Sequence, residues 1–553
     1  MVELIKHGVY LLDGQKVVED TTGMPSADEA RENTITYGIL RAHDVNGGKG
    51  KEMHIRFDAM MSHDITYVGI IQTARASGLT KFPLPYAMTN CHNSLCAVGG
   101  TINEDDHVFG LSAAKKYGGI YVPANQAVIH QFAREEMVKC GNMILGSDSH
   151  TRYGSLGNMG VGEGGGELVK QLLRNTWDIN APEVVLVWLE GTPRHGIGPH
   201  DVAISLVKAV FESGFVKNKV LEFAGPGVAN LSVDFRNGID VMTTETTCLS
   251  SIWVTDEKVR EHYELHRRPE DYKELRPGKV AYYDSMVRID LSKQESMIAL
   301  PYHPSNAVSI HELQADPETV LRRVEEDTKR RFGDKVHPDL VSKIRDGKVY
   351  ADQGIIAGCS GGTYENLCEA AAILRGQSAG NDYFSCSAYP QSSPVYIAAN
   401  RAGVTSDLIE AGVVIKPAFC GPCFGAGDVP SNNGLSIRHT TRNFPNREGS
   451  KPGQGQISMV ALMDARSIAA SAANVVSSPP PPTSTTRPTT SPTASTTRST
   501  SIASIEAMAR PTPSSRSATV PTSRTGPRCT RCRRTCWSSW LPSSTTPSRR
   551  PTS

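Results

Sequence analysis

The chain has 553 residues, more than one hydrophobic core usually serves, so several domains are expected. Residues 475–553 hold eleven Arg and one acidic residue, a net charge of +10, so residues 1–474 carry −9 of the total charge of +1. This acidic body gives no electrostatic reason to expect a nucleic-acid partner. No run of about 18 apolar residues occurs, so the sequence predicts no membrane span.

The cysteines and the first residues indicate a cellular compartment. The twelve Cys are scattered without a dense, regular framework, which in a long chain favours metal-binding or catalytic thiols over disulfides. The first residues lack the pattern of a secretory signal peptide. We therefore expect a cytoplasmic protein and leave a mitochondrial location open.

Strand-like and helix-like segments alternate along residues 1–474. Residues 141–146 form a short apolar run typical of a buried strand, and residues 183–189 are a second, clearer one. The glycine-rich residues 160–166 predict a loop that leads into a helix over 167–173. Such alternation favours an α/β fold with mainly parallel sheets.

Composition and a Pro/Gly-rich segment at residues 192–200 divide the chain. We predict α/β domains over residues 1–195, 196–298 and 299–474. The following residues, 475–553, are rich in Ser, Thr, Pro and Arg and lose apolar periodicity, so we predict a disordered tail.

Two explanations of this tail remain open. One is a natural disordered extension, and the other is translation in a shifted reading frame, which Arg without Lys beside Pro, Ser and Thr favours. The tail cysteines Cys529, Cys532 and Cys536 have a spacing that could bind zinc. Chance is the preferred explanation, because no folded scaffold is predicted around them.

Three cysteines carry the strongest chemical signal. Cys359 lies in Gly-Cys-Ser-Gly-Gly, and Cys420 and Cys423 lie in Phe-Cys-Gly-Pro-Cys-Phe-Gly. Three such thiols can hold three corners of an iron–sulfur cube, which leaves one iron free for water or a substrate hydroxyl. The closely spaced pair could instead be a redox dithiol or half of a zinc site.

Histidines beside a carboxylate suggest proton transfer. Asp148 and His150 lie in Gly-Ser-Asp-Ser-His-Thr, and His130 lies in Ile-His-Gln. An imidazole held by a carboxylate is a tuned proton donor. Asp148 and His150 would face one side if the segment is extended. The alternative is a capping turn before the glycine-rich loop.

Two arginines suggest an acidic substrate. Arg442 and Arg447 flank Asn-Phe-Pro-Asn, a sequence that predicts a turn in which both side chains could enter one pocket. Guanidinium groups bind carboxylates in a bidentate manner. The alternative is a pair of arginines facing solvent.

Over about residues 30–474, these segments resemble the aconitase family, whose members move water within hydroxy di- or tricarboxylates. The resemblance implies a 4Fe-4S cluster held by Cys359, Cys420 and Cys423, and a small polycarboxylate substrate. It also implies that the catalytic residues are His92, His130, Asp148, His150 and Glu245. The substrate-binding residues it implies are His63, Ser149, Arg442 and Arg447.

The chain departs from the family at three positions. Cys91 precedes His92 where the family has Asp, Val241 replaces an Asn, and Gly361 stands where an Asn follows the first cluster cysteine. A thiol is a poor acceptor for orienting an imidazole. His63 resembles the isopropylmalate-type branch, so we leave the substrate unnamed.

The family's catalytic base, a serine on a fourth swivelling domain, has no counterpart in residues 475–553. Either a separate subunit supplies that domain or the chain is truncated, and we expect little turnover from this chain alone. Two other interpretations remain open. One is a non-catalytic iron–sulfur protein or an iron- or redox-responsive binding protein, and the other is a zinc or dithiol protein.

Overall fold

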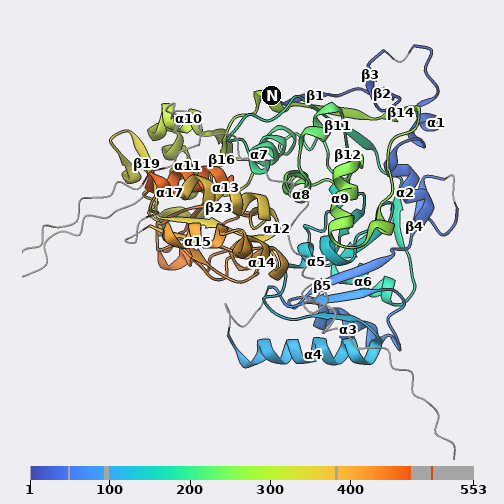
Figure 1. Ribbon diagram of the computed structural model, residues 1–553, viewed down its shortest axis with the longest axis horizontal. Coiled ribbons are helices and arrows are strands. Elements are labelled where there is room, and N and C mark those ends of the chain that lie inside the picture. Colours follow the sequence, from blue (N-terminus) through green and yellow to red (C-terminus); the bar gives the residue numbers. More distant parts are fainter. Residues whose placement is uncertain are drawn as a thin grey trace, which may run out of the picture.

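The computed structural model describes residues 2–20, 22–47, 50–92, 99–379, 384–474 and 500–501. Three larger sheets organise the described residues, and helices cover them (Figure 1). Most strand pairs in these sheets are parallel, which confirms the predicted α/β class. Among the described helices, none has both the length and the apolar character needed to cross a membrane.

The first sheet is parallel throughout, in the order β7-β6-β5-β8-β9. The predicted strand over 141–146 is confirmed as β8, whose four residues are all buried. Residues 160–162, predicted as loop, instead belong to β9, which pairs with β8; a Cβ at Gly160 would lie 2.9 Å from the Thr151 carbonyl oxygen, so glycine permits close packing against the segment after β8. The strands are β5 (Ala59–His63), β6 (Tyr86–Thr89), β7 (Ile120–Val122), β8 (Met143–Gly146) and β9 (Met159–Gly162). The helices around them are α3 (Tyr67–Ala76), α4 (Thr101–Tyr117), α5 (Ile129–Glu136) and α6 (Gly165–Leu172).

The second sheet has the order β1-β15-β11-β12-β13, with only β1 antiparallel to its neighbour. The predicted strand over 183–189 is confirmed as β11. It belongs to the predicted first domain but pairs with strands of the predicted second domain, and the division into domains stays a prediction. The strands are β1 (Val2–Ile5), β11 (Val184–Glu190), β12 (Val220–Ala224), β13 (Ser250–Trp253) and β15 (Ser285–Asp290). The helices are α7 (Pro199–Val210), α8 (Val233–Met242) and α9 (Glu257–Leu265).

The third sheet has the order β17-β16-β24-β23-β20-β21-β22, parallel from β24 to β22. Its strands are β16 (Met297–Ala299), β17 (Ala307–Ser309), β20 (Gln353–Ile356), β21 (Ser385–Ala388), β22 (Val414–Ile415), β23 (Leu435–His439) and β24 (Met459–Met463). Its helices are α10 (Ile310–Ala315), α11 (Pro317–Phe332), α12 (Gly358–Gly361), α13 (Tyr364–Leu374), α14 (Ser393–Arg401), α15 (Val404–Glu410), α16 (Gly421–Phe424) and α17 (Ala465–Ala473).

Short elements complete the described chain. The predicted tail lies outside the described residues, and so do its three cysteines; the exception is β25, which pairs with β19. The short helices are α1 (Ala27–Arg31) and α2 (Ile35–His43). The short strands are β2 (Val9–Leu12), β3 (Lys16–Val18), β4 (Glu52–Ile55), β10 (Trp177–Asn180), β14 (Val280–Tyr283), β18 (Ile344–Arg345), β19 (Lys348–Ala351) and β25 (Thr500–Ser501).

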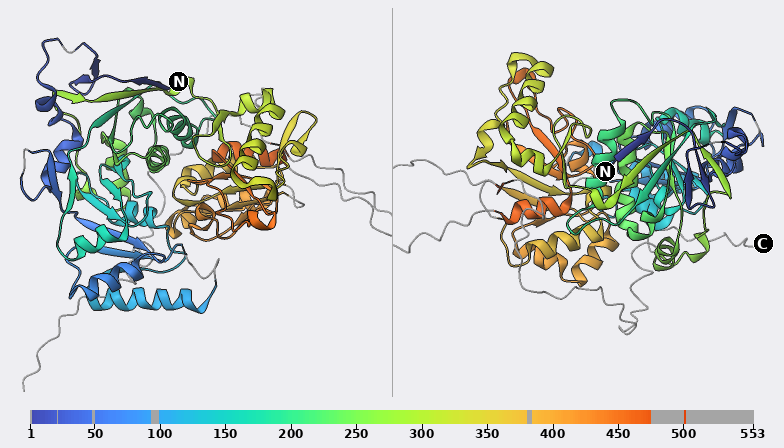
Figure 2. Two further views of the ribbon diagram at one scale, coloured as in Figure 1. Left: turned by 180° about the vertical axis from the view of Figure 1, so that it is seen from behind. Right: turned by 90° about the horizontal axis from the view of Figure 1, so that it is seen from above.

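The third sheet and its helices form a body beside the other two sheets (Figure 2). Arg134 of α5, completely buried, joins all three parts of the molecule. Its Nη1 donates to the carbonyl of Cys359 at 2.9 Å, and its Nη2 donates to the carbonyl of Asn237 in α8 at 3.4 Å. This single side chain therefore ties α12, the short helix that carries Cys359, to helices beside the first and second sheets.

Candidate active site

Strand ends of the first sheet bring three predicted site residues together. His63 is the last residue of β5, His92 follows β6 closely, and Asp148 follows β8. These three strands are neighbours and run in the same direction. Their carboxyl ends therefore share one edge of the sheet, where ligands bind in open α/β sheets.

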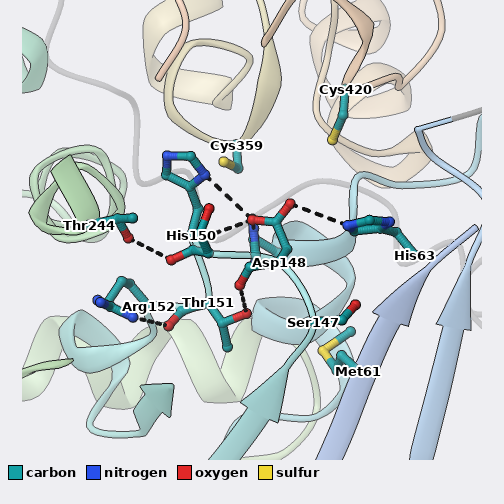
Figure 3. Close-up of polar contacts among 12 residues, drawn as sticks. Met61, His63, Ser147, Asp148, His150, Thr151, Arg152, Thr244, Cys359 and Cys420 are labelled. Carbon is teal, nitrogen blue, oxygen red and sulfur yellow. Dashed lines mark hydrogen bonds and ion pairs between the residues drawn. The ribbon is translucent and has the colours of Figure 1, made fainter. Parts of the chain in front are cut away.

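Strand ends of the third sheet also carry predicted site residues. Cys359 follows β20, Cys420 and Cys423 follow β22, and Arg442 and Arg447 follow β23. These strands are also parallel within one sheet. The carboxyl ends of two separate sheets therefore supply the candidate site, with Cys359 and Cys420 above Asp148 in Figure 3.

Asp148 is the centre of the polar network (Figure 3). Its Oδ1 lies 3.0 Å from His130 Nε2 and 3.4 Å from His150 Nδ1. Its Oδ2 lies 3.3 Å from His92 Nε2 and 3.7 Å from His63 Nε2. The rings of His63 and His92 stack with centroids 3.9 Å apart. Four predicted histidines thus surround one predicted carboxylate.

The segment that carries Asp148 is a turn, so the extended conformation considered for Asp148 and His150 is wrong. The backbone N–H of His150 donates to Asp148 Oδ1 at 2.7 Å, and the N–H of Thr151 donates to the Asp148 carbonyl at 3.1 Å. A Cβ at Gly162 would lie 2.5 Å from that carbonyl, so only glycine permits this close packing. The side chain of Asp148 holds its own turn and still faces the histidines.

Burial and neighbouring charges set the protonation of this network. Burial raises the pKa of Asp148, but the His130 charge and hydrogen bonds from three histidines hold it well below its usual range. Burial lowers the pKa of His92, whereas Cys91 and Asp148 raise it well above its ordinary value. Burial lowers the pKa of His130 to about 4 and, with the charge of His92, that of His63 to about 3. At neutral pH, an ionised Asp148 therefore faces a charged His92 and two neutral imidazoles.

Glu245 extends the network to the arginine segment. Its Oε1 lies 2.7 Å from His150 Nε2 and accepts from Arg442 Nε at 2.6 Å. Burial raises the pKa of Glu245, but these two partners lower it below its ordinary value. Ser149 is exposed, and its carbonyl accepts a hydrogen bond from Thr244 at 2.8 Å.

The three predicted cluster thiols lie close to this network, since the charge of Asp148 acts on the pKa of Cys359 and that of His92 acts on the pKa of Cys423. Cys359 and Cys420 are buried, and Cys423 is half-buried. Burial raises the pKa of Cys359 and of Cys423, and a hydrogen bond to Cys91 together with burial raises that of Cys420. Arg447 Nη1 donates to the carbonyl of Cys423 at 2.7 Å, so this arginine also supports a cysteine loop.

The local backbone suits a bound inorganic group. Gly358 has φ of +73°, and a Cβ there would lie 2.6 Å from Cys423 Sγ, so glycine keeps the space over this sulfur open. Among the described residues, Cys359, Cys420 and Cys423 are not one of the sets whose ligand atoms all lie within 4.8 Å of one another. Cys359 and Cys423 nevertheless lie near enough to Cys420 to help raise its pKa, and three thiols from two separate segments are the donor set of a cube. The residues present therefore fit a 4Fe-4S cluster.

Sequence reasoning missed several contacts. Asp64, beside His63, accepts from the backbone N–H of His92 at 3.0 Å and lies 3.2 Å from His107 Nε2. Cys91 Sγ lies 3.2 Å from His92 Nδ1, and burial raises the Cys91 pKa while Cys420 and His92 lower it to about 6. The position of Asp64 directly after His63 was a signal that could have found it, but no local pattern pointed to the buried Arg134.

Comparison of the sequence with known proteins finds one family and a group of similar subunits. The sequence profile of the Aconitase family (aconitate hydratase) matches residues 37–470. The chain is 25% identical over 421 residues to the 3-isopropylmalate dehydratase large subunit 1 of Thermotoga maritima, which covers 75% of this chain and 92% of that protein. It is 27% identical to the 3-isopropylmalate dehydratase large subunit of Moorella thermoacetica and to large subunit 1 of Pyrococcus furiosus, with the same coverage.

The fold and the relatives define a hydro-lyase, an enzyme that removes or adds water. The chain belongs to the aconitase family. The predicted resemblance and the predicted enzyme class are thereby confirmed.

Proposed function

We propose that the chain is the cluster-binding subunit of a hydro-lyase that dehydrates and rehydrates a hydroxy dicarboxylate of the isopropylmalate class. The observation that carries the proposal is the meeting of two sheet edges. One edge contributes Asp148 and its histidines, and the other contributes Cys359, Cys420 and Cys423. The names of the relatives support the substrate class and a large-subunit role.

The cysteine trio would hold the cluster, which when bound supplies an iron that acts as a Lewis acid on the substrate hydroxyl. His92 is the proposed acid, because its pKa is raised and Asp148 lies 3.3 Å from Nε2. Its Nε2 proton would pass to the departing hydroxyl. Asp148 would keep His92 charged, while His130 and His150 hold Asp148 in place.

Substrate carboxylates would bind to Arg442 and Arg447, with Ser149 and His63 as further contacts. Glu245 would orient His150 and Arg442 through its two hydrogen bonds. Burial and the charge of Arg442 lower the pKa of Arg447, which supports a shared binding region for the two guanidinium groups. Two adjacent cations suit a substrate with two carboxylates.

The base that removes the proton beside the hydroxyl would come from a separate small subunit. The relatives are named large subunits, which supports a partner of this kind. We therefore expect turnover only when the cluster-loaded chain is combined with such a subunit.

The test is anaerobic reconstitution with iron and sulfide, followed by metal analysis and assay with and without a small subunit of the isopropylmalate type. We expect about four iron and four sulfide per chain, and water elimination from 3-isopropylmalate that exceeds elimination from citrate. One zinc and no sulfide would contradict the cluster. A full cluster without turnover on either acid would instead support a non-catalytic iron–sulfur protein.

A further inference from the structure

A fourth thiol, Cys91, lies against the candidate site and is not one of the predicted cluster ligands. Cys420 Sγ is 4.0 Å from Cys91 Sγ, and the Cys420 N–H donates to the Cys91 carbonyl at 2.9 Å. His92, the next residue, places its Nδ1 3.2 Å from Cys91 Sγ. Two sulfurs and one imidazole nitrogen therefore converge in a site where all three residues are buried.

The spacing of these atoms suits a single small ion. In a tetrahedral zinc site, with Zn–S of about 2.3 Å and Zn–N of about 2.0 Å, two sulfurs stand about 3.8 Å apart and a sulfur and a nitrogen about 3.5 Å apart. The corresponding distances here are 4.0 Å between Cys91 and Cys420 and 3.2 Å between Cys91 and His92. The third pair, Cys420 Sγ and a His92 ring nitrogen, lies within 4.8 Å, so side-chain adjustments of about 1 Å would complete a zinc ligand set.

The outer contacts of His92 match those of a metal ligand. With Nδ1 toward the sulfurs, its Nε2 faces Asp148 Oδ2 at 3.3 Å. Ligating histidines commonly donate their second ring N–H to a carboxylate, which fixes the tautomer and strengthens the ligand. The hydroxyl of Thr89 lies 3.6 Å from Cys91 Sγ and gives the sulfur one further polar contact.

The other compact donor group is less suited to a metal. His63, Asp64 and His92 also lie within 4.8 Å of one another. One Asp64 oxygen accepts from the His92 backbone, and the other lies 3.2 Å from His107. Both oxygens are therefore engaged, whereas the Cys91 and Cys420 sulfurs face each other.

We propose that Cys91, His92 and Cys420 form a site for Zn²⁺ in the chain that lacks its cluster. Binding releases the thiol protons to solvent and leaves the oxidation state of zinc and sulfur unchanged. Because Cys420 also belongs to the proposed cluster ligands, zinc and the cluster exclude each other; this clause alone rests on the proposed function. Zinc would then hold Cys420 and block cluster assembly.

The first experiment measures Zn²⁺ affinity of the full chain, purified anaerobically and freed of iron, by competition with a chromogenic chelator. Co²⁺ serves as an absorbing substitute whose thiolate bands report sulfur ligation. We expect Cys91→Ser to weaken Zn²⁺ binding by more than about 100-fold, and Asp148→Asn by about 10- to 100-fold. The matched control is Cys368→Ser, a half-buried thiol on α13, which should bind as the unchanged chain does.

The second experiment separates the two metal sites. Cys423→Ser should keep tight Zn²⁺ binding and lose cluster assembly, whereas Cys91→Ser should assemble about four iron per chain even after pre-incubation with Zn²⁺. Unchanged Zn²⁺ affinity in Cys91→Ser, or lost affinity in Cys423→Ser, would overturn the zinc site. Failure of cluster assembly in the unchanged chain would contradict the proposed cluster but leave the Zn²⁺ result intact.

Discussion

The two halves of the site differ in how far protein groups alone stabilise the side chains in them. The acid–base half, formed by Asp148 and its four histidines, has a carboxylate held by hydrogen bonds and a charged His92 beside it. The thiol half, Cys359, Cys420 and Cys423, buries sulfurs whose pKa values are raised. Protein groups alone therefore hold the acid–base half in place. The buried thiols of the other half favour the thiolate form only when a metal group compensates their charge.

Loss of one thiol is the change for which we expect the largest effect, and this effect should be confined to the thiol half. Cys423→Ser is expected to reduce bound iron from about four per chain to nearly none, because a cube with two thiolates is not retained. The free energy of unfolding of the cluster-free chain should change by less than about 1 kcal/mol, since Cys423 is half-buried. Iron and sulfide analysis beside urea unfolding measures both. Iron retained at the unchanged level would remove Cys423 from the ligand set.

Loss of the central carboxylate should leave the thiol half intact. Asp148→Asn is expected to lower kcat by about 100- to 1000-fold, because His92 loses the group that keeps it charged. Iron content should stay at about four per chain. The measurement is a steady-state assay of the reconstituted complex with metal analysis of the same sample. If iron disappears together with activity, the two halves are not independent.

A buried acid that joins α5 of the first sheet to α14 of the third should make stability depend on pH. Glu135 of α5 accepts from Ser392, which caps α14, at 2.6 Å. Burial raises its pKa from 4.5 to about 7. Between these values the folded state holds a proton that the unfolded state releases, so stability falls as pH rises, by about 3 kcal/mol in total.

Glu135→Gln cannot ionise and should remove this dependence. Urea unfolding at about pH 5 and about pH 8 gives the measurement, and the variant should gain stability over the unchanged chain at the higher pH. Gln131→Asn is the control, because it alters the neighbour that donates to Glu135 and keeps the ionisable group. An equal pH dependence in Glu135→Gln would show that Glu135 is ionised in the folded protein.

The smallest expected effect concerns the joint between the halves. Arg134→Met removes the hydrogen bond to the Cys359 carbonyl and should lower the free energy of unfolding by about 2 kcal/mol. The cluster should also be lost faster in air, because the loop that carries Cys359 is less firmly held. Arg134→Lys should restore part of both. Visible absorption of the cluster over time, beside urea unfolding, tests this prediction.

Local sequence patterns predicted two buried strands and the short motifs that carry the candidate site residues. The apolar runs that became β8 and β11 were recognisable because buried parallel strands are short and continuously apolar. The cysteine trio and the Asp148 segment were recognisable because their spacing within short motifs has chemical meaning. The strand over 160–162 was missed because glycine usually marks a loop.

Contacts across long sequence distances could not be predicted. Cys91 and Cys420 lie 329 residues apart, and nothing near either residue indicates the other. The hydrogen bond between Glu135 and Ser392 joins positions 257 residues apart. Such contacts form where the sheets and their helices pack against one another. That packing depends on many residues far apart in the sequence, so a short sequence pattern cannot predict it.

The joint formed by Arg134 also constrains the biogenesis of the protein. Its two carbonyl partners lie 103 and 225 residues later in the chain. A nascent chain that has emerged only as far as Arg134 therefore lacks both groups, and this buried guanidinium gains its full set of carbonyl partners only after residue 359 has also been synthesised.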